Sequence, residues 1–287
     1  MEIHILPGNS SIPSQLPSVP IRSPIEIINN LRLVYDQKQI ETFQDLLDSL
    51  ALDNKFDILD LDIIMIDAIR HDDAQFVEAL LSHGLHLHSD YALEAAKSKA
   101  KNVLEALFKN GWNVNKPISD AQPPVLGFVA QDQDMVSWLL RNGADPNQKC
   151  LIDLTPLSYA VHYAPIPNIK LFLDNGGDTQ QGQLLFHALD RESEVLEVLR
   201  LLLKEGAPLN ATMYQNHPFS WSLYAFMGLG TILHKATELG KVDVVRFLVH
   251  EGVDLSIKDA NGDTALDCAR RLSKTEVVQL LEDSSNH

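Results

Sequence analysis

Cysteine and long apolar runs are scarce in this chain of 287 residues. The two cysteines, Cys150 and Cys268, lie far apart in the sequence, so we expect no disulfide and a reducing compartment, either the cytoplasm or the nucleus. No apolar run approaches the roughly 18 residues that a membrane-spanning helix needs. The N-terminus also lacks the basic and apolar pattern of a secretory signal. We therefore expect no association with membranes.

Basic side chains are also in deficit, with 23 Lys and Arg against 39 Asp and Glu, for a formal net charge of −16. Nucleic-acid binding depends on neutralising phosphates with cationic side chains, so this balance argues against direct binding of nucleic acid. The sequence has no Gly-rich phosphate loop, no Gly-x-Ser-x-Gly and no Cys-x-x-Cys. We therefore predict that the chain is not an enzyme and holds no cofactor and no metal.

What the sequence does contain is a unit of two short helices, clearest between residues 230 and 252. Thr231 can cap the first helix by accepting hydrogen bonds from its free backbone N–H groups. Gly240 can end that helix in a left-handed conformation, and Gly252 stops the second helix. The apolar face of the second helix comprises Val244, Val245, Phe247 and Leu248. Two such short helices cannot bury their apolar faces alone, so copies are expected on either side.

Copies of this unit recur, each closed by a glycine that follows an apolar cluster. The closing residues are Gly84, Gly111, Gly143, Gly176, Gly206 and Gly252. Most successive pairs are separated by about 33 residues, a period typical of helical repeats. Thr155 and Thr231 stand at the same distance before their closing glycines, and each is followed five positions later by alanine.

This pattern resembles the ankyrin repeat. The segments Thr155-Pro-Leu-Ser and Thr231-Ile-Leu-His look like the family's Thr-Pro-Leu-His box, and Asn142-Gly-Ala-Asp-Pro-Asn looks like its hairpin turn. The resemblance covers residues 58–284 and is most specific in the second half. It implies an all-α solenoid of stacked helix pairs joined by hairpin loops, with about six to seven repeats.

The pattern also predicts how the chain is divided. Residues 1–24 are rich in proline and serine, which favours a flexible tail; a linear motif for a partner is the alternative. Residues 25–57 form divergent helices that cap the first end of the solenoid, or else an independent dimerising hairpin. Residues 58–284 form the repeat domain, and residues 285–287 form a short tail.

One hairpin loop, residues 211–229, is longer than the period allows. It concentrates aromatic side chains, namely Tyr214, Phe219, Trp221, Tyr224 and Phe226. Exposed aromatic residues are typical of binding hot spots. The loop therefore either contacts a partner or folds back to cover the flank of the stack.

Several polar clusters favour structural roles over chemistry. His83, His86 and His88 have the residue types of a Zn²⁺ site, but they occupy a turn in the repeat frame where polar residues are routine. The resemblance implies that His234 bonds the backbone of adjacent loops. We expect Cys268 to be buried and Cys150 to lie exposed in a hairpin loop without the positive surroundings of a reactive thiolate.

These observations predict a non-enzymatic scaffold that binds another protein, because the ankyrin family consists of protein-binding modules. The expected form is a monomeric regulatory adaptor such as a transcription coregulator; a ubiquitin-ligase adaptor or a cytosolic signalling inhibitor is the alternative. The predicted contact residues are the aromatic loop and the hairpin tips Gln148, Lys149, Asp153, Asp259, Asn261 and Asp263.

Two other classes stay open. The chain could be an enzyme or small-molecule binder in which residues 211–229 cover a pocket, with His217 and His234 as the acid–base pair. It could also be a structural spacer without a partner sensitive to the loop.

Overall fold

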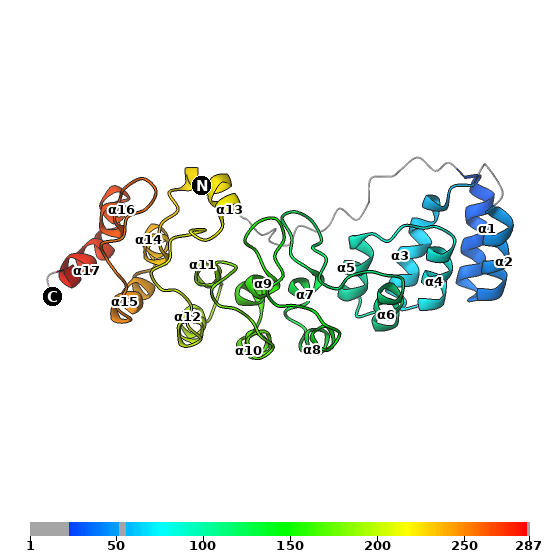
Figure 1. Cartoon of the computed structure of the whole chain (residues 1–287), viewed down its shortest axis with the longest axis horizontal. Coiled ribbons are helices and arrows are strands. Elements are labelled where there is room, and N and C mark those ends of the chain that lie inside the picture. The colour runs from blue at the N-terminus through cyan, green and yellow to red at the C-terminus, as the bar shows by residue number, and fades with distance from the viewer. Residues whose placement is uncertain (1–22, 52–55, 286–287) are drawn as a thin grey trace. The chain divides into compact units, whose positions relative to one another are not determined.

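The computed structural model describes residues 23–51 and 56–285, so most of the predicted tail of residues 1–24 lies outside the described residues. Within those ranges the regular structure is helical, and the β-structure is limited to isolated bridges (Figure 1). The chain divides into two compact units, residues 1–111 and 112–287. Among the described helices, none is long and apolar enough to cross a membrane. The predicted all-α class is confirmed.

The first unit contains three helix pairs. Its elements are α1 (Ile25–Asp36), α2 (Ile40–Leu50), η1 (Ile58–Leu61), α3 (Asp62–Arg70), α4 (Ala74–Ser82), α5 (Ser89–Lys97) and α6 (Lys101–Lys109). Within each pair the two helices contact each other, α3 packs on α5, and α4 packs on both α2 and α6. The core of the first two pairs is aromatic: Phe76 meets Tyr35 and Phe43 edge to face at centroid distances of 5.0 and 5.2 Å.

Polar contacts also hold α1 and α2 to the next pair. The Tyr35 hydroxyl donates to Asp73 at 2.9 Å, and Arg32 pairs with Asp67. The His83 Nε2 lies 3.0 Å from Asp48, while its Nδ1 donates to a backbone carbonyl one turn earlier. Both ring nitrogens of His83 are therefore already used in packing the helices.

The second unit continues the pattern with shorter first helices. Its elements are α7 (Val125–Phe128), α8 (Gln133–Arg141), α9 (Pro156–Tyr163), α10 (Ile166–Asp174), α11 (Leu184–Leu189), α12 (Val195–Lys204), α13 (Pro218–Tyr224), η2 (Ala225–Met227), α14 (Ile232–Glu238), α15 (Val242–His250), α16 (Ala265–Arg271) and α17 (Thr275–Ser285). The first helices α7, α9, α11, α14 and α16 pack on one another in series. Each also packs on the second helix of its own repeat, which is the predicted stack of pairs.

The sequence signals that begin and end these helices act as expected. Thr155, Thr231 and Thr264 each start a helix with a reciprocal capping box, in which the third helical residue bonds back to the cap. The closing glycines adopt positive φ, for example 85° at Gly143 and 80° at Gly252, a conformation that a Cβ disfavours.

Asparagine side chains in the hairpins connect neighbouring repeats of the second unit. Asn147 accepts from the backbone N–H of Asp178 at 2.7 Å and donates to the carbonyl of Gly176 at 2.8 Å. Asn115 makes the same two bonds one hairpin earlier, and Asn210 makes one of them to the hairpin that follows α15. These bonds fix the hairpins, and hence the surface they present.

The connection between α11 and α12 carries a buried arginine. Arg191 donates to the carbonyls of Val161, His162 and Ala164 at the end of α9, at 2.6 to 3.3 Å. The last carbonyls of a helix have no partner within it, so this guanidinium caps α9 from the neighbouring repeat. The connection at residues 190–194 thus helps to hold two neighbouring repeats together.

Candidate interaction surface

The insertion of residues 211–229 is an ordered helical segment rather than the extended loop that the sequence predicts. Pro218 occupies the first turn of α13, where its missing N–H costs nothing. The His217 Nδ1 accepts from the backbone N–H of Ser220 at 3.2 Å and caps the helix. Gly228 ends the segment at a φ of 80°. The helix was missed because its residues carry no repeat signal.

One side of the insertion is anchored in the second unit. The buried Ser220 hydroxyl accepts from the backbone N–H of Asp153 at 3.0 Å. The ring of Tyr214 stacks on Tyr224 with centroids 5.3 Å apart, and the Tyr214 N–H donates to Gln183 Oε1 at 3.1 Å. Burial raises the pKa of the Tyr214 hydroxyl well above its ordinary value.

Backbone bonds fix both ends of the insertion as well. The Met213 N–H donates to the Gly230 carbonyl at 3.0 Å, and the Ala260 N–H donates to the Gly228 carbonyl at 3.2 Å. The second bond joins the insertion to the hairpin that precedes α16. The segment is therefore held at its start, its middle and its end.

The insertion also exposes large apolar side chains. We call these four residues the α13 patch: Phe219 (48% exposed), Trp221 (47%), Leu223 (48%) and Phe226 (77%). Phe219 and Leu223 are four residues apart and share one face of α13, whereas Trp221 lies on another face and Phe226 belongs to η2. Leu223 was not among the predicted contact residues, because the prediction rested on the excess of aromatic side chains.

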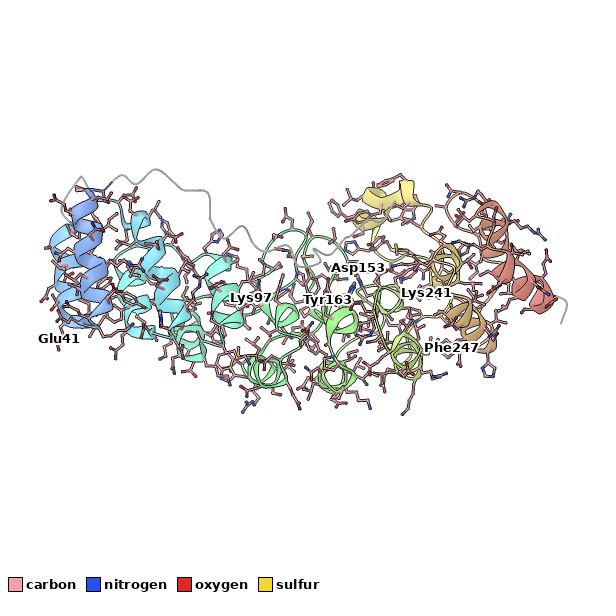
Figure 2. The ribbon with its side chains drawn as sticks, turned by 180° about the vertical axis from the view of Figure 1, so that it is seen from behind. Glu41, Lys97, Asp153, Tyr163, Lys241 and Phe247 are labelled. Carbon is pink, nitrogen blue, oxygen red and sulfur yellow. The ribbon has the colours of Figure 1, made fainter. Side chains whose placement is uncertain are left out.

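Three of the predicted contact residues are buried, so the expectation that they are exposed is wrong. Tyr214 and Asp153 are each only 6% exposed. The Asp153 carboxylate, labelled in Figure 2, accepts from the Gly182 N–H at 3.2 Å and from the Gln183 amide at 2.6 Å. Asp259 is also buried and folds its own hairpin by accepting from two backbone N–H groups at 2.8 and 3.0 Å.

The remaining hairpin residues are accessible. Gln148 and Lys149 are half-buried, Asn261 is exposed, and Asp263 is half-buried. The Asp263 carboxylate accepts from Arg271 at 3.1 Å. These residues keep part of their surface free beside the insertion.

Cys150 is buried rather than exposed, because the hairpin folds over it. Its thiol lies 3.6 and 3.7 Å from the carbonyls of Ile152 and Leu154, and burial raises its pKa. Cys268 is buried, as expected. Neither environment favours a thiolate.

The two histidines of the enzyme alternative both hold backbone. His217 caps α13, as described above. His234 Nδ1 accepts from the Thr231 N–H at 3.1 Å, and its Nε2 lies 3.1 Å from the carbonyl of Asp263 in the next hairpin. The bond that the resemblance implies for His234 is thus confirmed. One cavity, of about 450 Å³, is lined by residues that include Leu233, Asp254 and Leu281, not by either imidazole.

Comparison with known proteins supports the repeat assignment. A family model described as ankyrin repeats (3 copies) matches residues 221–286. Putative ankyrin repeat protein FPV230 of Fowlpox virus (strain NVSL) is 26% identical over 177 residues, which cover 60% of this chain and 87% of the viral protein. B-cell lymphoma 3 protein homolog of Mus musculus is 32% identical over 132 residues, 44% of this chain but only 26% of that protein.

A solved structure gives the same result. The ankyrin repeat domain of human ASB11 matches with a TM-score of 0.51 and 25% identity, over 67% of this chain and 82% of that one. Together with the capped helix pairs and their closing glycines, these likenesses show that the chain is an ankyrin-repeat protein. Ankyrin repeats indicate a scaffold for protein–protein interaction.

Proposed function

We propose that this chain is a non-enzymatic regulatory adaptor that binds another protein through the α13 patch. The observation that supports the proposal is the combination of four exposed apolar side chains with an anchored helix. Large exposed apolar patches on soluble proteins mark interaction sites. Here the patch belongs to an insertion, so the repeats do not need it to complete their own cores.

The anchoring contacts make the patch suitable for binding. Ser220 and Tyr214 hold α13 against the second unit. Backbone bonds at Met213 and Gly228 hold the two ends of the insertion. A partner that docks on a preformed surface has less ordering entropy to overcome than one that must fold a loop. Trp and Phe side chains then supply large contact area from few rotatable bonds.

The accessible hairpin residues complete the proposed surface. Two hairpins each donate one backbone hydrogen bond to the insertion, from Asp153 to Ser220 and from Ala260 to Gly228. The accessible polar residues of these hairpins are Gln148, Lys149, Asn261 and Asp263. Interfaces commonly surround an apolar centre with a polar rim. Asp153 and Asp259 act indirectly, because they fix the hairpins that carry these residues.

Within this class we propose a role as a transcription coregulator in the nucleus or cytoplasm, acting as a monomer. The likeness to the murine B-cell lymphoma 3 protein homolog supports a regulatory role, although this chain spans about a quarter of that protein's length. The acidic net charge of −16 argues that any association with nucleic acid passes through a partner protein.

The test is affinity purification of the whole chain from its own cells, followed by mass spectrometry, beside the F219A/W221A double variant. A matched control is L239A/L272A, which removes two exposed leucines elsewhere in the second unit. We expect a protein that is retained by the native chain and the control and lost from F219A/W221A, with melting temperatures that agree within about 2 °C.

Identical partners in all three forms would refute the α13 patch as the contact surface. A fall of several degrees in the melting temperature of F219A/W221A, with partner binding unchanged, would show that these side chains pack rather than bind. The retained protein is then purified and titrated against each form, so that a direct contact is distinguished from an indirect one.

A further inference from the structure

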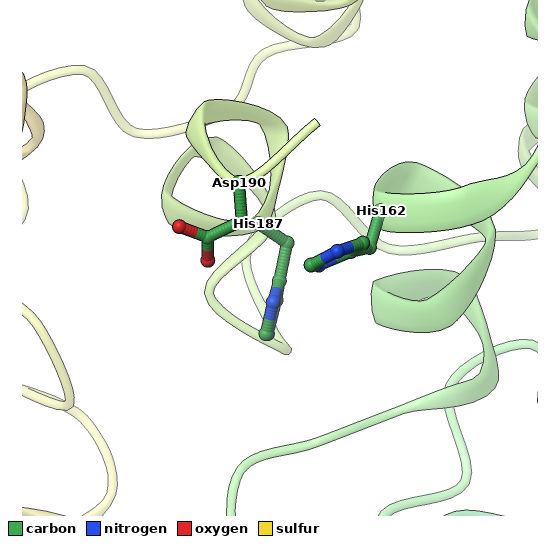
Figure 3. Close-up of side chains that lie close together, drawn as sticks. All are labelled: His162, His187 and Asp190. Atoms are coloured by element: carbon green, nitrogen blue, oxygen red, sulfur yellow. The ribbon is translucent and has the colours of Figure 1, made fainter. Parts of the chain in front are cut away.

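A cluster of two histidines and an aspartate lies between neighbouring repeats of the second unit, apart from the α13 patch. His162 belongs to α9, His187 belongs to α11, and Asp190 follows α11 directly. The two imidazole centroids are 6.3 Å apart. One ligand atom from each of the three residues lies within 4.8 Å of the other two. Figure 3 shows His162 projecting from its helix toward His187.

One nitrogen of each imidazole has no partner in the surrounding protein. The Nδ1 atoms of His162 and His187 are both shielded from solvent, and neither has a hydrogen-bond partner among the residues that the structure describes. A buried nitrogen without a partner costs free energy. Buried polar atoms of this kind are explained by a strained site, an unseen water or a bound ion.

The residue types distinguish between these explanations. Two imidazole nitrogens and one carboxylate are the ligand set that Zn²⁺ takes in sites with three protein ligands and one open position. Asp190 is exposed, whereas both histidines are half-buried, so the open position would lie on the side of Asp190. A water molecule or a side chain of a partner could occupy it.

We propose that His162, His187 and Asp190 form a Zn²⁺ site with an open fourth position. Bonds of about 2.1 Å in a tetrahedral site place the ligand atoms about 3.4 Å apart. The present spacing of up to 4.8 Å thus requires rotation of the side chains toward one another. The packing of α9 on α11 keeps the two imidazoles within reach of that rotation.

The ammonium group of Lys235 competes with Zn²⁺ for the Asp190 carboxylate. Its Nζ lies 2.8 Å from the Asp190 carboxylate and 3.2 Å from the Phe186 carbonyl. The ammonium lies 2.8 Å from both carboxylate oxygens, so one oxygen has to leave the ammonium to ligate Zn²⁺ while the other keeps it. Such an outer bond orients a ligand, but the positive charge also weakens cation binding. The Lys235→Met variant should therefore bind Zn²⁺ more tightly than the native chain.

The experiment is isothermal titration of the whole chain with ZnCl₂ at neutral pH, after EDTA treatment and dialysis. We expect one Zn²⁺ per chain for the native protein and for K235M. Visible absorption of the Co²⁺-loaded protein should report tetrahedral coordination. H162Q and H187Q should each weaken the binding at least about tenfold, the range seen when groups that support a metal site are removed. Circular dichroism confirms that the variants are folded.

The matched control is H86Q/H88Q, which removes two histidines of the first unit from a turn and leaves the proposed site intact. It should bind Zn²⁺ like the native chain. The proposal is overturned if neither the native chain nor K235M binds Zn²⁺ at a concentration of about 100 μM. This concentration is far above the dissociation constants of structural zinc sites. It is equally overturned if H162Q and H187Q bind as tightly as the native chain, or if the control loses the ion instead.

Discussion

The anchoring of α13 gives a prediction whose size follows from the structure. Replacing Tyr214 by alanine removes a ring that is 6% exposed and stacked on Tyr224 at 5.3 Å. Truncating a buried aromatic side chain costs about 3–5 kcal/mol. The lower end applies here, because Ser220 and the backbone bonds at both ends still hold the segment. We expect the insertion to lose about 3 kcal/mol of local stability.

Hydrogen exchange measures this loss directly. A loss of about 3 kcal/mol raises the population of the open insertion by about two powers of ten, so the amides of residues 218–227 should exchange about a hundredfold faster. Amides in α9 and α15 should change little. Tyr214→Phe keeps the stacked ring and should exchange like the native chain. Phe226→Ala, at a site that is 77% exposed, should change local stability by less than about 0.5 kcal/mol. Unchanged exchange in Tyr214→Ala would refute the view that this ring anchors α13.

The contacts between repeats give two more predictions. Arg191→Met leaves three carbonyls at the end of α9 without their charged donor. It should lower the free energy of unfolding by about 3 kcal/mol. Urea denaturation measures this loss, and an unchanged midpoint would contradict the capping role. Asn147→Ala removes one accepted and one donated bond to the next hairpin and should cost about 1–3 kcal/mol. Asn115→Ala should lower the stability by a similar amount, and thermal melts of the two variants check both values. If both variants are within about 0.5 kcal/mol of the native chain, water replaces these bonds and the prediction is wrong.

The repeat architecture was predictable because its signals are local. Thr231 and Gly240 specify the start and the end of one helix through their own hydrogen bonding and backbone preference, and the structure places a capping box and a φ of 68° there. Such signals need no knowledge of distant residues. The apolar faces between them were equally readable, since their spacing alone assigns them to the core.

The exposure of the hairpin tips was not predictable in the same way. Asp153 lies in a hairpin, where polar residues are usually accessible. Its carboxylate accepts from Gly182 and Gln183 of the next hairpin, and its N–H donates to Ser220, which belongs to an insertion with no repeat pattern. Local sequence therefore identified the hairpin correctly and gave the wrong exposure for its aspartate.

The histidine cluster shows the same limitation. Metal motifs are recognised in sequence when two ligands lie within one turn or one short loop. His162 and His187 lie on the first helices of successive repeats, so only the stacking of α9 on α11 brings them together. The histidines that did look like a motif, His86 and His88, belong instead to a single turn before α5.

The position of the insertion explains how one repeat can carry an extra surface segment without losing its fold. The capping box at Thr231, the closing turn at Gly252 and the stacking of α14 on α11 and α16 are all retained after the extra residues. The added segment satisfies its own polar groups by capping α13 with His217 and by bonding to neighbouring hairpins. The core does not need the exposed apolar side chains of the segment, because the residues of the repeat already fill it. The exposed side chains of this segment, such as Phe226, can therefore be changed at little cost to stability, and the proposed specificity for a partner would be set there.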